Sequence, residues 1–508
     1  MTALDISKLN SDMNFREHLQ CRVWFRSRWF LFSLAGIVFL AILTGALTEA
    51  PTSYILGQVA LGISVYISFF FLADRPLINP IQAVVAFFYW WFGVGPVVIA
   101  TWDCMQGMPE IASGVQTSSM EALWIVALGL PLYAFAARLI LQWFSKTNIY
   151  ARFLFPEGKN YRPKVLIIYL ALMGLSMLAI LVLQRLGIQG QEEMSFFGGT
   201  KTNIWWVGVI TAVSSIAPFV TSALMTMLAV TPWKEISFNL RVLIGVMMAQ
   251  TVIGGMFSGS KLPIAFCGVY YICVCVSRNQ RPPWLILAVG TIIFLLFITP
   301  FVSYGRNEAI IQKTQDSQMR KQVFYDILKD PAAFFPTSVM DVDPSVFFRG
   351  LAPLDSEVTR RNGFFEGEWH GDTIVWGFET FVPRAFMPDK RDMNIGNFIC
   401  QTVGADIGIC GRNDTLTNLS ITIPFEFVGN YGWFLGVLSF GLIGILWTLL
   451  CTWMLSPARL SDHPLTPFLV LTTMGMEAPL GDFLAQLKGL VVPMLLCFLV
   501  YKIFRGKI

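Results

Sequence analysis

Cationic side chains at two places in the sequence could hold an anion such as a lipid pyrophosphate. Lys261 ends the run Ser-Gly-Ser-Lys at 258–261, and Arg306 follows a long apolar block. A cation at a membrane boundary attracts an anion strongly, because the local dielectric is low. The alternative interpretation is ordinary snorkelling, in which long side chains at helix ends reach toward water.

A second group of charges lies in the run Pro-Arg-Ala-Phe-Met-Pro-Asp-Lys at 383–390. Its two prolines predict a rigid turn that presents Arg384, Asp389 and Lys390 at defined angles. An arginine can bind a pyrophosphate through two N–H groups, and a carboxylate can take a proton from a sugar hydroxyl. The alternative is a structural Arg384–Asp389 pair that caps the turn.

Carboxylates could supply the base for such a reaction. Glu426 lies between aromatic residues in Pro-Phe-Glu-Phe-Val-Gly-Asn-Tyr-Gly at 424–432. It could be a base with a raised pKa, or it could pair with an arginine. Glu379 and Asp372 bracket a short predicted amphipathic helix and are weaker candidates. His370 could shuttle a proton, although a lone surface histidine is usually incidental.

The composition is typical of a membrane protein and excludes several other classes. Of 508 residues, 55% are hydrophobic and 13% charged, whereas soluble domains carry roughly 25% charge. The net charge of +4 is small, and no basic patch with interleaved aromatics predicts a nucleic-acid partner. The sequence shows no P-loop, Rossmann glycine pattern, HExxH or GxSxG motif. We therefore expect neither a cofactor nor a bound metal.

Apolar blocks predict an all-α polytopic fold with about 12 transmembrane helices. A cytoplasmic segment (1–28) precedes nine spans within 29–302, and a large external loop of short helices (303–432) precedes three more within 433–508. That loop holds 29 of the 68 charged residues. The expected spans are 29–48, 54–73, 77–100, 121–142, 165–186, 204–230, 242–258, 262–277, 283–302, 433–455, 465–481 and 488–504.

Basic residues predict the orientation. Lysines and arginines gather in the N-terminal segment, in 143–164 and at the C-terminus, so the positive-inside rule places both termini in the cytoplasm. We therefore expect a protein of the bacterial inner membrane. Its long loop would then face the periplasm or an equivalent compartment. Cys400 and Cys410, ten residues apart in that loop, could form a disulfide there or remain free thiols.

The layout and three short motifs resemble the bacterial O-antigen and exopolysaccharide polymerases of the Wzy type, which are related to O-antigen ligases. Residues 382–390 are similar to the family's Pro-Arg-x-x-Trp-Pro-Asp-Lys-Pro run, and 424–436 to its Pro-x-Glu-x-x-x-Asn-Phe/Tyr-Gly-x-x-Gly run. Gly-Ser-Lys at 259–261 stands where relatives often carry Gly-Ser-Arg. Met387 and Arg391 depart from the first motif, and the ligases' histidine before the late glycine-rich turn is absent.

The resemblance implies a GT-C-like membrane glycosyltransferase that polymerises repeat units linked to undecaprenyl pyrophosphate, without a metal or a nucleotide sugar. The expected pyrophosphate ligands are Arg306, Arg384, Lys261 and Lys390, and the candidate bases are Glu426, Asp389 and Glu379. Membrane lipid, a chain-length regulator and a flippase are the expected partners.

Three other functions remain open from the sequence. One is glycan transfer of the O-antigen ligase type, and the second is a polysaccharide or lipid flippase without transferase activity. The third is a structural or regulatory membrane subunit, in which Arg384 and Glu426 would tolerate substitution. A transporter that couples to ions would carry charges within its spans, and the predicted spans contain few.

Overall fold

The structure is a computed structural model of the chain. It describes residues 28–72, 79–144, 163–185, 284–302, 351–379, 395–408, 410–412, 419–455 and 466–481, with single positions elsewhere. The chain divides into two compact units, and each is described by itself. The first comprises Met1–Ala151, Phe347–Phe381 and Ile395–Leu484, and the second comprises Arg152–Val346, Val382–Asn394 and Ala485–Ile508.

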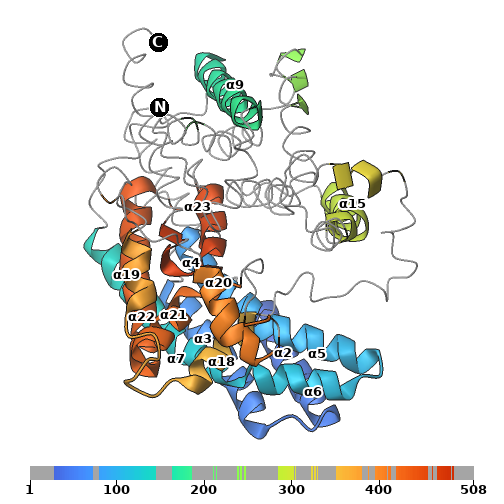
Figure 1. The fold of residues 1–508 in the computed structure, drawn as a ribbon, viewed down its shortest axis with the longest axis vertical. Coiled ribbons are helices and arrows are strands. Elements are labelled where there is room, and N and C mark those ends of the chain that lie inside the picture. The colour runs from blue at the N-terminus through green and yellow to red at the C-terminus, as the bar shows by residue number, and fades with distance from the viewer. Residues whose placement is uncertain are drawn as a thin grey trace, which may run out of the picture. The chain divides into compact units, whose positions relative to one another are not determined.

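Every regular element in these described ranges is a helix (Figure 1). The first unit contains α2 (Arg28–Leu47), α3 (Thr52–Leu72), α4 (Pro80–Phe88), η1 (Tyr89–Val94), α5 (Gly95–Met105), α6 (Pro109–Ser118), α7 (Met120–Trp143), α18 (Leu351–Arg361), α19 (Asp372–Glu379), α20 (Ile395–Ile399), η7 (Cys400–Gly404), α21 (Ile423–Tyr431), α22 (Trp433–Leu455), α23 (Thr466–Thr472) and η9 (Thr473–Glu477). The second contains α9 (Pro163–Arg185), α15 (Trp284–Ile293) and η3 (Phe294–Ile298). The all-helical class predicted from the sequence is confirmed for this part of the chain.

Within the described ranges, four helical stretches are long and apolar enough to cross a membrane. They are Thr52–Leu72, Pro80–Met105, Met120–Trp143 and Trp433–Leu455. Trp433–Leu455 coincides with the span predicted from hydropathy, and each of the other three differs from its predicted span by only a few residues at either end. The longest uninterrupted one, Met120–Trp143, has 24 residues and is therefore about 36 Å long, enough for a hydrocarbon core of about 30 Å.

Helices α7 and α22 pack closely because small residues line their contact. Gly129 of α7 faces the ring of Phe440, and a Cβ built on Gly444 of α22 would lie 2.6 Å from the carbonyl oxygen of Tyr133. The Tyr133 hydroxyl donates to the carbonyl of Ile81 at 2.8 Å, so this stretch of α7 is also held to α4. Glycine in a membrane helix interface lets two backbones approach in this way.

Replacing Gly444 with alanine should therefore destabilise the protein, although alanine is the better helix former. The new methyl group would push against a backbone carbonyl, and we expect a loss of about 1–3 kcal/mol in unfolding free energy, the usual cost of overpacking. Thermal unfolding in detergent measures it. The matched control is Gly36→Ala in α2, where nothing lies within 4 Å of the added Cβ. Equal unfolding curves for the two variants would contradict the tight α7–α22 contact.

The membrane-length stretch Pro80–Met105 changes from α-helix to π-helix and back along its length. Asn79 caps α4, because its Oδ1 accepts the backbone N–H groups of Ile81 and Gln82 at 3.0 and 2.9 Å. The π-helix η1 follows, and its Phe92 carbonyl accepts a hydrogen bond from the buried Gln58 amide of α3 at 3.4 Å. The Phe92 ring stacks on Phe425 of α21 with centroids 5.5 Å apart. The π-helix thus contacts both α3 and α21.

Two parts of the predicted external loop, 347–381 and 395–432, belong to the same compact unit as the spans. Helix α18 packs against α7, and the Ser356 hydroxyl accepts the Ala122 backbone N–H at the start of α7, at 2.9 Å. Helix α21 packs against α22. These segments of the loop thus pack directly on span helices of the same unit. In the second unit, η3 and its neighbours pack through Ile298, Phe301, Val302, Val323 and Ile327.

Candidate functional site

Of the seven site residues predicted from the sequence, the structure describes two, Glu426 and Glu379. The four expected pyrophosphate ligands (Lys261, Arg306, Arg384 and Lys390) and the candidate base Asp389 lie outside the described residues. The described part of the candidate site therefore consists of carboxyl groups.

Helix α21, which carries Glu426, has clear sequence reasons for its two ends. Thr422 is extended at its N-cap, and Pro424 stands in its first turn, where a missing N–H costs nothing. Gly432 ends it with a φ of 86° and donates its N–H to the Val428 carbonyl at 2.8 Å. Residues with a side chain rarely adopt a backbone conformation with positive φ, which explains the glycine between α21 and α22.

The Glu426 side chain is fully buried. The backbone N–H of Leu480, in the turn after η9, donates to its Oε2. One helical turn later, the Asn430 amide donates to the Glu426 carbonyl at 2.7 Å and to the Thr373 hydroxyl of α19 at 2.6 Å. The carboxyl group of Glu426 is thus oriented by α21 and the Leu480 turn, with α19 bound one helical turn away.

Glu379 is half-buried at the last residue of α19. Two residues earlier, a Cβ on Gly377 would lie 3.1 Å from the backbone nitrogen of Gly481, so α19 runs over the Leu480 turn that holds Glu426. The Oε2 atom of Glu379 is buried, and among the described residues it has no hydrogen-bond partner. The helix that carries Glu379 therefore lies against the turn that holds Glu426.

A third carboxyl group, Asp355 of α18, belongs to the same region and was not predicted from the sequence. It is fully buried, and the backbone N–H and hydroxyl of Thr422 donate to its two oxygens at 3.3 and 3.0 Å. Burial raises the pKa of Asp355 well above its usual range, and the hydrogen bonds from Thr422 offset this only in part. Asp355 thus binds the N-cap residue of α21, and Glu426 lies in the first turn of that helix.

A pattern in the sequence could have pointed to Asp355. Helix α18 buries Ala352, Leu354 and Val358, and Asp355 lies between them at helical spacing. An acid inside the apolar stripe of an amphipathic helix is buried when the helix packs, whereas Arg360 on the other face stays exposed.

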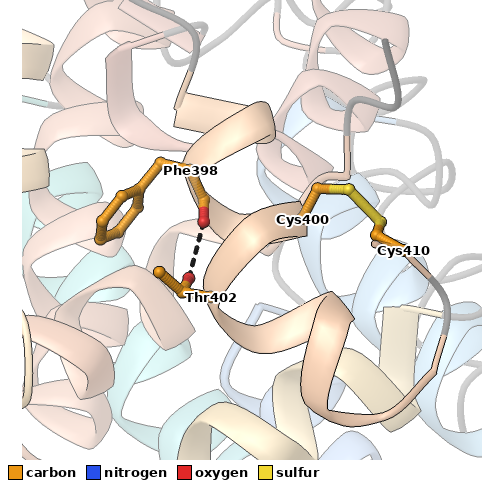
Figure 2. Close-up of a disulfide and its surroundings, with 4 residues drawn as sticks. All are labelled: Phe398, Cys400, Thr402 and Cys410. Carbon is orange, nitrogen blue, oxygen red and sulfur yellow. Dashed lines mark hydrogen bonds between the residues drawn. A yellow bond between two sulfur atoms is a disulfide. The ribbon is translucent and has the colours of Figure 1, made fainter. Parts of the chain in front are cut away.

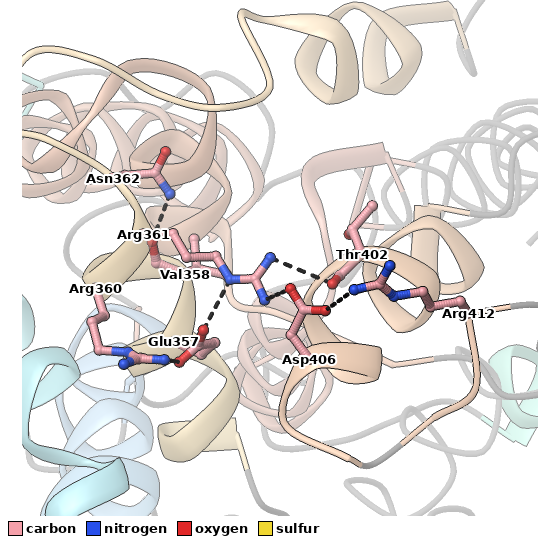
Figure 3. Close-up of polar contacts among 8 residues, drawn as sticks. All are labelled: Glu357, Val358, Arg360, Arg361, Asn362, Thr402, Asp406 and Arg412. Carbon is pink, nitrogen blue, oxygen red and sulfur yellow. Dashed lines mark hydrogen bonds and ion pairs between the residues drawn. The ribbon is translucent and has the colours of Figure 1, made fainter.

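Ion pairs hold the C-terminal turn of α18 (Figure 3). Glu357 pairs with Arg361 at 2.9 Å and with Arg360 at 2.7 Å. Arg361 also pairs with Asp406, which in turn pairs with Arg412 at 3.3 Å. Arg361 is only 18% exposed, so its pairs are less screened than the outer ones. This network joins α18 to the segment that follows η7.

A disulfide between Cys400 and Cys410 closes the segment that begins with η7 (Figure 2). Of the two alternatives left open by the sequence, the structure thus has the bonded pair. The same turn is held by the Thr402 hydroxyl, which donates to the Phe398 carbonyl at 2.7 Å. The disulfide closes the chain segment that carries Asp406, the partner of Arg361.

Replacing both cysteines with serine should lower the unfolding free energy by about 2–3 kcal/mol, because an open segment gains chain entropy when unfolded. Reductant should cause the same loss in the wild type and none in the double variant, as measured by thermal unfolding. Cys104→Ser, at a free thiol outside the loop, is the control. An unfolding temperature insensitive to reductant in the wild type would contradict a stabilising role.

Comparison with family models, with curated proteins and with solved structures finds no match to this chain. The site is therefore interpreted from its own chemistry. It offers two fully buried carboxyl groups and one half-buried one around α21, directly before a helix long enough to cross a membrane.

Proposed function

We propose that this chain is a membrane glycosyltransferase that joins lipid-linked oligosaccharide repeat units into a polysaccharide. The supporting observation is the pair of fully buried carboxyl groups, Asp355 and Glu426, set at the N-cap and in the first turn of α21. A carboxylate is one of the groups that can take the proton of a sugar hydroxyl in general base catalysis. The motif resemblance around Glu426 points to the same chemistry.

In the proposed reaction, the acceptor hydroxyl attacks the anomeric carbon of a glycan on polyprenyl pyrophosphate. A new carbon–oxygen bond forms, the bond to the pyrophosphate oxygen breaks, and the carboxylate takes the hydroxyl proton. Glu426 is the first candidate for this base, with Glu379 and Asp389 as alternatives. The leaving pyrophosphate carries away the electron pair, and Arg306, Arg384, Lys261 and Lys390 would bind it.

The two carboxyl groups would have different tasks. Because the pKa of Asp355 is raised, its protonated form persists at a pH where an ordinary aspartate is ionised. A neutral carboxyl group can donate a hydrogen bond but cannot serve as a base. We assign to Asp355 the positioning of Thr422 and the first turn of α21, and through them of Glu426.

The remaining parts of the proposal concern the setting of this chemistry. We propose that the chain has 12 spans, a GT-C-like fold and cytoplasmic termini. We also propose that it lies in a bacterial inner membrane and acts together with a flippase and a chain-length regulator. The disulfide supports an oxidising compartment for the loop, since such bonds persist mainly outside the cytoplasm.

Complementation tests the proposal in cells that lack the chain and therefore make no long polymer. At matched expression, Glu426→Gln, Arg384→Ala and Arg306→Ala should each fail to restore long polysaccharide on a gel. Arg412→Ala, at an arginine that is 82% exposed, should restore it. Normal long polymer from all three site variants would exclude the proposed enzyme.

A further inference from the structure

Three aromatic side chains form an exposed cluster where the external segment meets α22. The rings of Phe364 and Phe365 lie 4.6 Å apart, and those rings lie 5.8 and 5.4 Å from Phe434. The three residues are 57%, 70% and 42% exposed, respectively. Clustered exposed aromatic rings of this kind mark an interaction surface.

Backbone hydrogen bonds fix the depth of this cluster relative to α22. We define the aromatic tip as residues 363–366, a turn closed by the Gly363 N–H on the Glu366 carbonyl at 3.0 Å. The N–H groups of Trp433 and Phe434, the first two residues of α22, donate to the carbonyls of Gly363 and Phe364 at 3.1 and 3.0 Å. The aromatic tip therefore lies level with the start of the span.

The hydrogen bonds from Trp433 and Phe434 to the aromatic tip also provide partners for N–H groups at the start of α22. The first N–H groups of a helix have no partner within that helix, and lipid offers them none. The aromatic tip supplies two carbonyl acceptors, so the first two N–H groups of α22 are bonded where the helix would enter a lipid phase. The Trp433 indole N–H is satisfied as well, by the Thr359 carbonyl at 2.7 Å.

The exposed face of α22 continues into the aromatic tip. Leu435, Leu438, Leu442 and Leu446 are 38%, 40%, 43% and 57% exposed. Their spacing of three and four residues places them on one side of the helix. This is the stripe that a membrane-crossing helix presents to lipid, and Phe434 begins it beside Phe364 and Phe365.

We propose that the aromatic tip inserts into the membrane interface, with Phe364 and Phe365 among lipid acyl chains at the leaflet where α22 begins. The occupant of this surface is bilayer lipid, because the surface is continuous with the lipid-facing stripe of the span. Aromatic side chains favour this interface region. The insertion sets the height of α18 and α21, and so of Asp355 and Glu426, above the hydrocarbon core.

Photo-crosslinking of the full chain in a bilayer of phosphatidylethanolamine and phosphatidylglycerol tests this inference. The photoreactive p-benzoylphenylalanine, similar in shape to phenylalanine, replaces Phe364 or Phe365. The two controls replace Glu368, an exposed carboxylate just after the aromatic tip, and Phe425, which is fully buried. We expect lipid adducts at 364 and 365 in yields several-fold above those at 368 and 425, as measured by mass spectrometry.

Adducts at 364 and 365 to a second copy of the chain, or lipid yields no higher than at 368, would overturn the inference. An intact Cys400–Cys410 disulfide in each variant verifies that the loop is folded. The crosslink requires no substrate and no turnover. Its failure would therefore leave the glycosyl-transfer proposal untouched, and loss of activity in site variants would not affect the lipid adducts.

Discussion

Replacing Glu426 with glutamine is expected to lower the rate of polymer extension by about 10²–10⁴-fold, the usual contribution of a general base. The change removes the charge and the proton acceptor but keeps the shape. The amide oxygen of glutamine can still accept the Leu480 N–H that now binds Oε2. We therefore expect a folded protein that has lost catalysis, measured as the initial rate of glycan lengthening in isolated membranes.

Two comparisons make this result specific to Glu426. Glu368→Gln changes an exposed carboxylate of the same loop and should leave the rate unchanged. Glu379→Gln and Asp389→Asn test the other candidate bases, and only one of the three should show the full loss. A wild-type rate for Glu426→Gln would exclude Glu426 as the base and leave it the structural task of holding the Leu480 turn.

The stability of the protein should fall as pH rises, and Asp355 should be a main cause. An aspartate in the unfolded chain ionises around its ordinary pKa of 3.8, whereas burial raises the pKa of Asp355 in the folded protein. Between these two values, the unfolded state releases a proton that the folded state keeps. The unfolding free energy then decreases with pH by up to about 1.4 kcal/mol per pH unit until the folded pKa is reached.

Asp355→Asn should remove this dependence. The asparagine oxygen can still accept the Thr422 N–H, and its amide can donate to the Thr422 hydroxyl, so no buried polar group is left without a partner. We expect a flatter profile and higher stability than wild type at neutral pH, measured by thermal unfolding across pH. Asp372→Asn, at an exposed carboxylate, should keep the wild-type slope. Parallel profiles for wild type and Asp355→Asn would contradict a protonated Asp355.

The four described stretches long and apolar enough to cross a membrane could be predicted from the sequence, because length and hydropathy decide them locally. Residues 433–455 run for 23 positions without a charge, and the helix occupies the same range that hydropathy predicted. Such features depend on neighbours in the sequence, so no knowledge of the fold is needed.

The contacts around Glu426 could not be predicted, because they join distant parts of the chain. Its partner Leu480 lies 54 residues away, and Thr422 meets Asp355 across 67. The choice between a disulfide and two free thiols depends on whether η7 brings Cys400 back to Cys410. The apolar spacing of α18 could have pointed to a buried Asp355, but which residues it meets depends on the packing of α18 against α7 and α21.

Reconstitution tests the central claim most directly. The purified chain is placed in liposomes with polyprenyl pyrophosphate-linked repeat units, without a nucleotide sugar and with a chelator present. We predict longer lipid-linked glycans and one free polyprenyl pyrophosphate for every linkage formed, both lost in Glu426→Gln. Glycans that stay at a single repeat unit with folded wild-type protein, under conditions where lipid-linked substrate is accessible, would contradict the proposed polymerase activity.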